Sequence, residues 1–269
     1  MKLFTNKKKL REEIGKINNI SFVPTMGFLH KGHESIIKKS VKGSGKTLVS
    51  IFVNPKQFNS RKDLKSYPRN TKNDIKILKK LKIDYLYKPS YDDIYKFKTK
   101  NKIYLDKFSK ELCGQFRKGH FKGVIDVVNR LLEITNPKKI LLGNKDFQQL
   151  YLIKKHIMKN KIKTQVCPCK TIRDKNFIAY SSRLKKLNHN EKTKLIKIIK
   201  VLKIYKKDLI LKKKIYNFSK IKKKIISIGA KNVDYIKLID LKTLKKPKKN
   251  KFNLFYAFYI GNVRLIDNF

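Results

Sequence analysis

Two histidines, His30 and His33, are the side chains best placed for chemistry in this sequence. They follow a short apolar run, with Gly32 between them. A strand, a glycine-containing turn and a helix start leave free backbone N–H groups, and the helix dipole adds positive potential there. Residues three apart on a helix share a face, so both imidazoles can reach one ligand. The pattern predicts a phosphate site where the two rings stabilise charge on a phosphorus under attack.

Two other interpretations of the histidine pair stay open. The rings could bind a metal ion, but no third ligand stands nearby, because Glu34 would point elsewhere on a helix. They could also be structural core residues. The ordinary pKa of histidine is about 6.5, so a neighbouring phosphate would be able to keep either ring protonated at neutral pH.

Polar residues also follow a second apolar run, at residues 47–53. Asn54 and Gln57 lie at the expected carboxyl end of a strand, which is where ligands bind in parallel sheets. Asn54 before Pro55 could simply start a turn. That explanation does not account for Gln57.

A third group follows residues 139–142. Gly143 allows a close approach, Lys145 offers a phosphate contact, Asp146 suits ribose hydroxyls, and Gln149 lies one helical turn further on. Taken alone, Asp146 is more simply interpreted as a helix N-cap. Nearer the C-terminus, Tyr180, Ser181, Ser182 and Arg183 bring hydroxyls and a guanidinium together, which suits a mobile clamp on the β- and γ-phosphates.

Alternating strands and helices must position these groups. Short apolar runs ending at proline or glycine predict strands at residues 20–23, 47–53, 84–87, 139–142 and 163–166. Apolar periodicity predicts helices at residues 33–41, 70–81, 124–134 and 147–158. This alternation is typical of an α/β fold with a parallel sheet covered by helices on both faces.

The sequence pattern changes after about Thr171, where strand–helix alternation gives way to lysine-rich stretches. Lysine-rich helical stretches at residues 191–207 and 219–228 precede two strand-like runs at residues 233–239 and 253–260. We therefore expect a first domain over residues 1–171 and a smaller α+β domain over residues 172–269. The basic segment 244–251 is expected to be a solvated connection between the two runs.

The formal charge of +50 suggests nucleic acid at first sight. Only eight of the 69 basic residues are arginine, the lysines are spread along the chain, and alanine occurs three times. This skew indicates codon drift at tolerated surface positions and no specific nucleic-acid partner, although selected polyanion binding stays an alternative.

The three cysteines cannot form a disulfide framework, and Cys167-Pro168-Cys169 has the wrong spacing for a zinc knuckle. The first residues lack the apolar core of a secretory signal, and no apolar run is long enough to cross a membrane. We expect a cytoplasmic protein.

Six stretches together closely resemble one family, the pantothenate synthetases (pantoate–β-alanine ligases). They are residues 24–33, 49–58, 117–124, 143–150, 181–183 and 263–268, in the family's order along almost the whole chain. The resemblance implies a Rossmann-like nucleotidyltransferase fold of the His-x-Gly-His superfamily, with a small C-terminal lid domain, in a cytoplasmic homodimer. It also implies that ATP with Mg²⁺ activates D-pantoate as pantoyl-adenylate. The amine of β-alanine then takes the acyl group, giving pantothenate and AMP.

The resemblance assigns catalytic roles to His33, as proton donor, and to His30 and Lys145. It places Gln57 and Gln149 on pantoate, with Gln57 also near β-alanine, and takes no metal ligand from the protein. The residues implied in ATP binding are Met26, Gly27, Phe28, Leu29, His30, Lys31, Gly32, His33, Gly143, Asn144, Lys145, Asp146, Ile172, Tyr180, Ser181, Ser182 and Arg183. Asn54, Tyr67, Arg117 and His120 match positions usual near the site.

The sequence departs from the family pattern at three places. Asn144 replaces a glutamate, Asn176-Phe177 replaces an Asp-Gly pair, and Leu184 replaces an asparagine. These changes put a local carboxylate and loop closure in question. The alternatives are a sister cytidylyltransferase, against which the pair Gln57 and Gln149 argues, a nucleic-acid-binding protein that kept the fold, and a pseudoenzyme.

Overall fold

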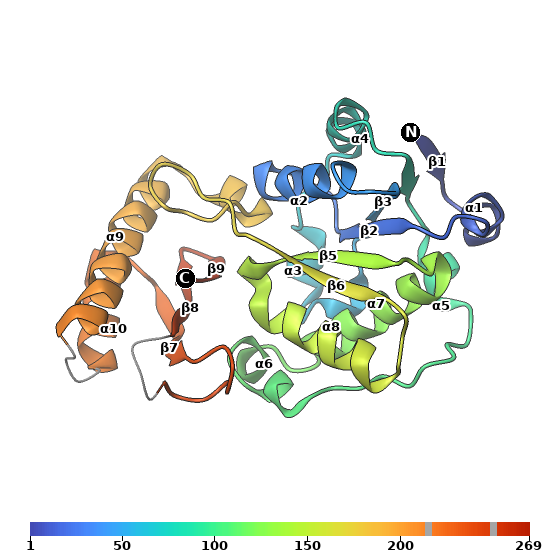
Figure 1. Ribbon diagram of the computed structural model, residues 1–269. Coiled ribbons are helices and arrows are strands. Elements are labelled where there is room, and N and C mark those ends of the chain that lie inside the picture. The colour runs from blue at the N-terminus through green and yellow to red at the C-terminus, as the bar shows by residue number, and fades with distance from the viewer. Residues whose placement is uncertain (213–216, 248–251) are drawn as a thin grey trace. The chain divides into compact units, whose positions relative to one another are not determined.

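The computed structural model describes residues 1–212, 217–247 and 252–269 (Figure 1). The chain divides into two units, Met1–Thr171 and Ile172–Phe269. Each unit has its own sheet.

Six parallel strands form the sheet of the first unit, in the order β1-β4-β3-β2-β5-β6. Their bounds are β1 Lys2–Phe4, β2 Ile20–Thr25, β3 Lys46–Ile51, β4 Tyr85–Tyr87, β5 Lys139–Gly143 and β6 Gln165–Cys169. The parallel sheet is confirmed, and all five predicted strands are present. The short edge strand β1 was not predicted.

The order of the strands reverses beside β2, because the chain passes from β2 to β3 on one side and later places β5 on the other. In open α/β sheets this switch point opens a crevice at the carboxyl ends of the strands, where ligands bind. The residues after β2 and β5 are therefore neighbours at the carboxyl ends of the strands, where ligands bind in folds of this kind.

Helices cover both faces of this sheet, with α2 and α4 over one face and α7 and α8 over the other (Figure 1). Ile37 of α2 and Leu78 of α4 pack with Val23, Val49 and Leu141 in one apolar cluster. None of the described helices is long and apolar enough to cross a membrane. The helices of this unit are α1 Lys7–Ile14, α2 Lys31–Val41, α3 Arg61–Lys65, α4 Thr71–Lys80, α5 Tyr91–Tyr95, α6 Cys113–Phe116, α7 His120–Thr135 and α8 Phe147–Lys159, with short 3₁₀ helices η1 Pro55–Gln57, η2 Lys107–Lys110 and η3 Asn144–Asp146.

The second unit is a smaller α+β structure, as predicted. Its antiparallel sheet has the order β7-β8-β9, and residues such as Ile198, Ile225 and Phe258 form its core. The sequence predicted β7 and β8 but missed β9. Residues 248–251 of the predicted basic connection lie outside the described residues. The elements are η4 Ser182–Lys186, α9 His189–Lys212, α10 Phe218–Ile228, β7 Asn232–Ile239, β8 Asn253–Ile260 and β9 Val263–Asn268.

Candidate active site

The segment between β2 and α2 makes a sharp turn. Gly27 has φ +74° and Phe28 has φ +52°, so two successive residues are left-handed. A Cβ at Gly27 would come within 2.9 Å of Asp74 Oδ2, so glycine is required there by space as well as by backbone angle. Phe28 is not glycine, and its conformation costs roughly 1–2 kcal/mol. Surrounding contacts must therefore hold it.

The carboxylate of Asp74 supplies those contacts. Phe28 N donates to Oδ2 at 2.8 Å and Leu29 N donates to Oδ1 at 2.7 Å. Asp74 lies in the first turn of α4 and is 1% exposed. The Thr25 hydroxyl also connects the turn to β3, because it accepts from Gly27 N and donates to the Ser50 carbonyl. Sequence reasoning missed Asp74, which looks like an ordinary acidic residue at a helix start.

The turn brings the two histidine rings together. His30 is the N-cap of α2, and its Nδ1 accepts from Gly32 N at 3.2 Å. This bond leaves Nε2 as the protonated nitrogen of a neutral ring. The His30 and His33 ring centroids are 4.0 Å apart with an interplanar angle of 32°. The predicted convergence of the two rings is thus present.

The hydrogen bonding of His33 differs from that of an ordinary core histidine. Its Nδ1 is buried and has no hydrogen-bond partner among the described residues. A structural histidine normally has its buried nitrogens satisfied. Nor do the described residues contain a group of three His, Cys, Asp or Glu side chains able to hold a metal ion.

Both rings are neutral at neutral pH in the free protein. Burial lowers the pKa of His33 to about 3, helped by His30 and Lys145. Burial and then Lys145 lower the pKa of His30 to about 4, against an opposing effect of Asp146. The protonated rings considered from the sequence therefore require an anionic ligand.

The segment after β5, which forms η3, lies near the two rings. The charge of Lys145 affects the pKa of both histidines, and the charge of Asp146 affects the pKa of His30. The Lys145 side chain is 18% exposed, and its Nζ lies 3.3 Å from Asp146 Oδ1. Asp146 stands at the N-cap of α8, but its side chain makes no capping hydrogen bond. Asp146 thus has the cap position that its simpler interpretation predicted, but its side chain does not do the capping. Gly143 has an ordinary φ of −75°, and a Cβ there would meet only Ile36, at 3.4 Å.

Gln57 adds an amide to the same region. Its Nε2 donates to Met26 Sδ at 2.8 Å, while its Oε1 accepts from Asn54 Nδ2 at 3.2 Å. Its backbone carbonyl accepts from His120 Nδ1 at 2.7 Å and Arg117 Nη2 at 3.3 Å. Asn54, Arg117 and His120, which match family positions, thus gather around Gln57.

Gly123 permits this arrangement, and sequence reasoning did not single it out. A Cβ there would come 2.2 Å from the Lys56 carbonyl oxygen, so only glycine lets α7 pack against η1. A glycine inside a helical pattern costs about 1 kcal/mol and often has a packing reason, which was the available signal.

Gln149 lies half-buried in the first turn of α8, and its side chain makes no hydrogen bond within the described residues. Its neighbour Gln148 is buried and donates to the carbonyls of Phe108 and Glu111, both at 2.7 Å, so it anchors a loop. Of the two adjacent glutamines, Gln148 is therefore bonded within the protein, whereas the Gln149 side chain has no such bond within the described residues. Tyr67, which also matches a family position, is buried with its ring edge-on against Phe58.

The remaining predicted residues, Ile172 and the segment 180–183, belong to the second unit. Within that unit Ser181 Oγ accepts from Arg183 N at 3.3 Å and so begins η4. Five positions earlier than Ser182, Phe177 has φ +67°. The departure from the Asp-Gly pair thus places a phenylalanine in a left-handed conformation.

Two features hold Phe177 there. Asp174 Oδ1 accepts from the backbone N–H groups of Asn176 and Ile178, both at 2.9 Å, which closes the turn. The Phe177 ring packs against Phe269 at 5.2 Å, with the Arg173 guanidinium 4.4 Å from its centroid. The turn keeps its shape without glycine because its neighbours stabilise it.

Comparison with known proteins adds the following findings. The family model described as pantoate-beta-alanine ligase matches residues 2–269. A pantothenate synthetase from Sulfurihydrogenibium sp. (strain YO3AOP1) is 39% identical over 256 residues, covering 93% of this chain and 91% of that protein. One from Endomicrobium trichonymphae is 37% identical over 276 residues, covering 100% and 97%. The crystal structure of pantoate-beta-alanine ligase from Francisella tularensis complexed with beta-gamma ATP and beta-alanine is 38% identical, with a TM-score of 0.88 and coverage of 100% and 97%.

Proposed function

This chain belongs to the pantoate–β-alanine ligase family, and we propose that it activates D-pantoate with ATP as pantoyl-adenylate before β-alanine accepts the acyl group. The ligation of pantoate to β-alanine follows from the family, and a related structure carries an ATP ligand and β-alanine. The observation that carries the intermediate is the pair of neutral imidazoles beside Lys145 at the switch point of the sheet.

ATP would lie over the two turns that end β2 and β5. The segment from Met26 to His33 leads into the positive N-terminal end of α2, and the segment from Gly143 to Asp146 offers Lys145 for the phosphates and Asp146 for ribose hydroxyls. The rings of His30 and His33 would donate to the phosphate that is attacked.

D-Pantoate would bind between Gln57 and Gln149. The Gln57 amide already donates toward Met26, and Gln149 has no partner within the described residues, so both can bond a new ligand. β-Alanine would then approach near Gln57. Met26 lies in the turn after β2 and accepts from Gln57, so the acid carboxylate and the α-phosphate would lie close enough to be held in line.

In the first step, a pantoate carboxylate oxygen bonds to the α-phosphorus while the bond to the β-phosphate oxygen breaks, releasing diphosphate. In the second step, the β-alanine amine nitrogen bonds to the acyl carbon, the acyl C–O bond breaks with its electron pair leaving on AMP, and the nitrogen releases one proton to solvent. Negative phosphate charge raises the proton affinity of His33, which lets that ring serve as proton donor once ATP is bound. Lys145 offsets charge on the phosphates throughout.

Mg²⁺ would accompany the triphosphate. Ions of this kind are usually held by substrate phosphates with one or two carboxylates, and Asp146 is the acidic side chain that would serve here, because both oxygens of Asp74 already accept from backbone N–H groups. When bound, the ion would offset phosphate charge. Asn144 in place of the family's glutamate leaves that segment with one carboxylate fewer.

The second unit would act as a lid. Ile172 would contact adenine, and Tyr180, Ser181, Ser182 and Arg183 would close over the phosphates and exclude water from the adenylate.

We also propose that the protein is a cytoplasmic homodimer. All three cysteines, Cys113, Cys167 and Cys169, are free thiols, as a reducing compartment would keep them.

Isotope exchange between ATP and diphosphate tests the first step. Exchange should require pantoate, and added β-alanine should then yield pantothenate and AMP. A folded, ATP-binding sample without exchange at any pantoate concentration would contradict the proposal, and transfer of a nucleotidyl group to another acceptor would favour the sister cytidylyltransferase.

Two variants test the assigned residues. His33→Ala and Lys145→Ala should each lower the exchange rate by about 10²-fold, the usual size for losing a preorganised donor. The matched controls are His189→Ala and Lys154→Ala, which remove exposed side chains of the same kinds. A site variant with nearly unchanged exchange would remove its residue from the proposed mechanism.

A further inference from the structure

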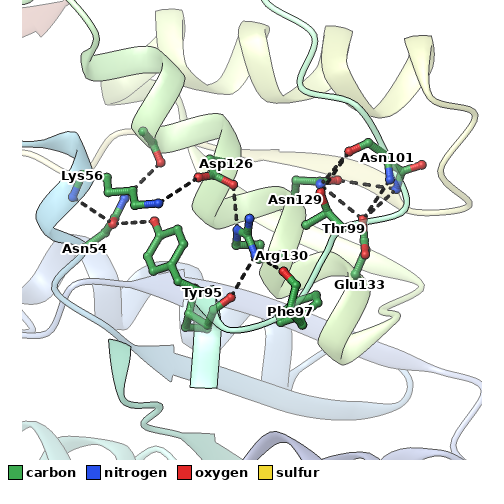
Figure 2. Close-up of polar contacts among 12 residues, drawn as sticks. Asn54, Lys56, Tyr95, Phe97, Thr99, Asn101, Asp126, Asn129, Arg130 and Glu133 are labelled. Atoms are coloured by element: carbon green, nitrogen blue, oxygen red, sulfur yellow. Dashed lines mark hydrogen bonds and ion pairs between the residues drawn. The ribbon is translucent and has the colours of Figure 1, made fainter. Parts of the chain in front are cut away.

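The orientation of the Asn54 amide is fixed by four hydrogen bonds, and Figure 2 shows those with Tyr95 and Lys56. Its Oδ1 accepts from Tyr95 Oη at 2.8 Å and from Lys56 N at 3.2 Å. Its Nδ2 donates to Gly123 O at 3.0 Å and to Gln57 Oε1 at 3.2 Å. Asn54 is 1% exposed. Reversing the amide would set its NH₂ group against the Lys56 N–H and its oxygen against the Gly123 carbonyl, so only this orientation fits.

Tyr95 is itself held firmly in place. Its ring lies between two cations, with Lys56 Nζ 3.8 Å and Arg130 Cζ 5.0 Å from the centroid. Arg130 is fixed in turn by Asp126 at 2.7 Å and by the carbonyls of α5 and the following loop (Figure 2). Burial and Asp126 raise the pKa of Tyr95, so its hydroxyl keeps the proton that it donates to Asn54.

This chain of bonds determines which end of Gln57 meets a ligand. Its Oε1 is occupied by Asn54, so its Nε2 is the end that remains for the site. In the free protein that NH₂ group rests on Met26 Sδ. A thioether is a weak acceptor, so a carboxylate or hydroxyl oxygen would displace it at little cost.

We propose that Tyr95 is a positioning residue for the acid substrate: its hydrogen bond holds Asn54 in the position that keeps the Gln57 NH₂ group toward the site, so that Gln57 recognises oxygen acceptors of the acid. Gln57 then does not accept a hydrogen bond from the ammonium group of the amine substrate. The inference rests on the proposed function, because the exchange reaction reports acid binding.

The variant Tyr95→Phe keeps the ring between its two cations and removes only the hydroxyl. It should raise the KM for pantoate in ATP–diphosphate exchange by about fivefold, the size expected for one neutral hydrogen bond. The KM for ATP should change by less than about twofold, because no nucleotide contact is altered. Thermal unfolding confirms that the variant is folded.

Tyr87→Phe is the matched control. It removes another buried tyrosine hydroxyl, which donates to Asp93 at 2.5 Å and to no site residue named above. A comparable loss of stability should leave both KM values unchanged. An equal rise in the KM for pantoate in both variants would show that Tyr95 acts only through general stability and would overturn the proposal.

A double-mutant cycle tests the route through Gln57. In a Gln57→Ala background, Tyr95→Phe should no longer alter the KM for pantoate, since the group that it orients is gone. A fivefold effect that persists there overturns the proposal. If the unmodified protein catalyses exchange but Tyr95→Phe has an unchanged KM for pantoate, this inference alone is overturned. If the unmodified protein catalyses no exchange, the proposed function is overturned and the inference with it.

Discussion

Asparagine in place of Asp74 keeps the shape of the side chain but replaces one of its two carboxylate oxygens by an NH₂ group. Both oxygens are in use, since they accept from Phe28 N and Leu29 N at 2.8 and 2.7 Å. In the variant one backbone N–H therefore faces a donor. The residue is 1% exposed, so water cannot replace the missing acceptor without opening the turn.

The expected magnitude follows from these bonds. A hydrogen bond to a charged group contributes about 1.5–3 kcal/mol, and an unsatisfied buried group costs a similar amount. The left-handed Phe28 also loses the contacts that offset its strain of roughly 1–2 kcal/mol. We expect the native turn to be disfavoured by about 3 kcal/mol. At about 1.4 kcal/mol per factor of ten, kcat/KM for ATP in the exchange assay should fall by about 10²-fold.

The control is Asp92→Asn, which removes the same charge from the first turn of another helix. Asp92 is 58% exposed and pairs with Lys96 at the surface, so its loss should cost less than about 1 kcal/mol and leave kcat/KM unchanged. Urea unfolding and exchange kinetics on both variants give the comparison. Asp74→Asn with kcat/KM within about threefold of the unmodified protein would refute the idea that Asp74 holds the nucleotide turn.

Further predictions concern pH, packing and strain. The His33 imidazole should not titrate by NMR between about pH 5.5 and 8 in the free protein, and ATP should raise its pKa. Burial lowers the pKa of His156 in the folded protein to about 4, below its value in the unfolded chain. The unfolded chain therefore binds a proton more readily, so the contribution of His156 to the unfolding free energy should be complete above about pH 6.5 and be lost as pH falls toward 4. Gly123→Ala should lower the unfolding free energy by about 2 kcal/mol or more in urea titrations, because its Cβ would overlap the Lys56 carbonyl. Phe177→Gly should be more stable than Phe177→Ala by about 1 kcal/mol, because only glycine relieves the left-handed strain.

The central strands β2, β3, β4 and β5 were predictable because most of their residues are buried and they form nearly continuous apolar runs. Strand β9 was not, because two of its buried residues are charged: Arg264 Nε donates to Asp234 at 2.7 Å, and Asp267 accepts from Arg173. Such paired charges break the alternation that marks a strand in sequence. Strand β6 extends past its predicted end because an edge strand tolerates Pro168.

The site residues also include some that could be predicted from the local sequence and some that could not. His30, His33 and Lys145 stand directly after strands, so local sequence predicts their placement. The residues that hold them act from far along the chain, and no spacing rule connects such positions. Asp74 is 46 residues from Phe28, and Tyr95 is 41 residues from Asn54. Only the folded chain brings these pairs together.

The two halves of this site rest on separate supports. The turn that would receive the nucleotide is fastened to α4 by Asp74, whereas Gln57 is fastened to α5 and α7 through Asn54, Tyr95 and Gly123. Mutations in α5 or α7 would therefore reshape the proposed acid site while the turn between β2 and α2 keeps its form. Such independence gives natural variation or directed evolution a route to new acid substrates that retains the chemistry of activation.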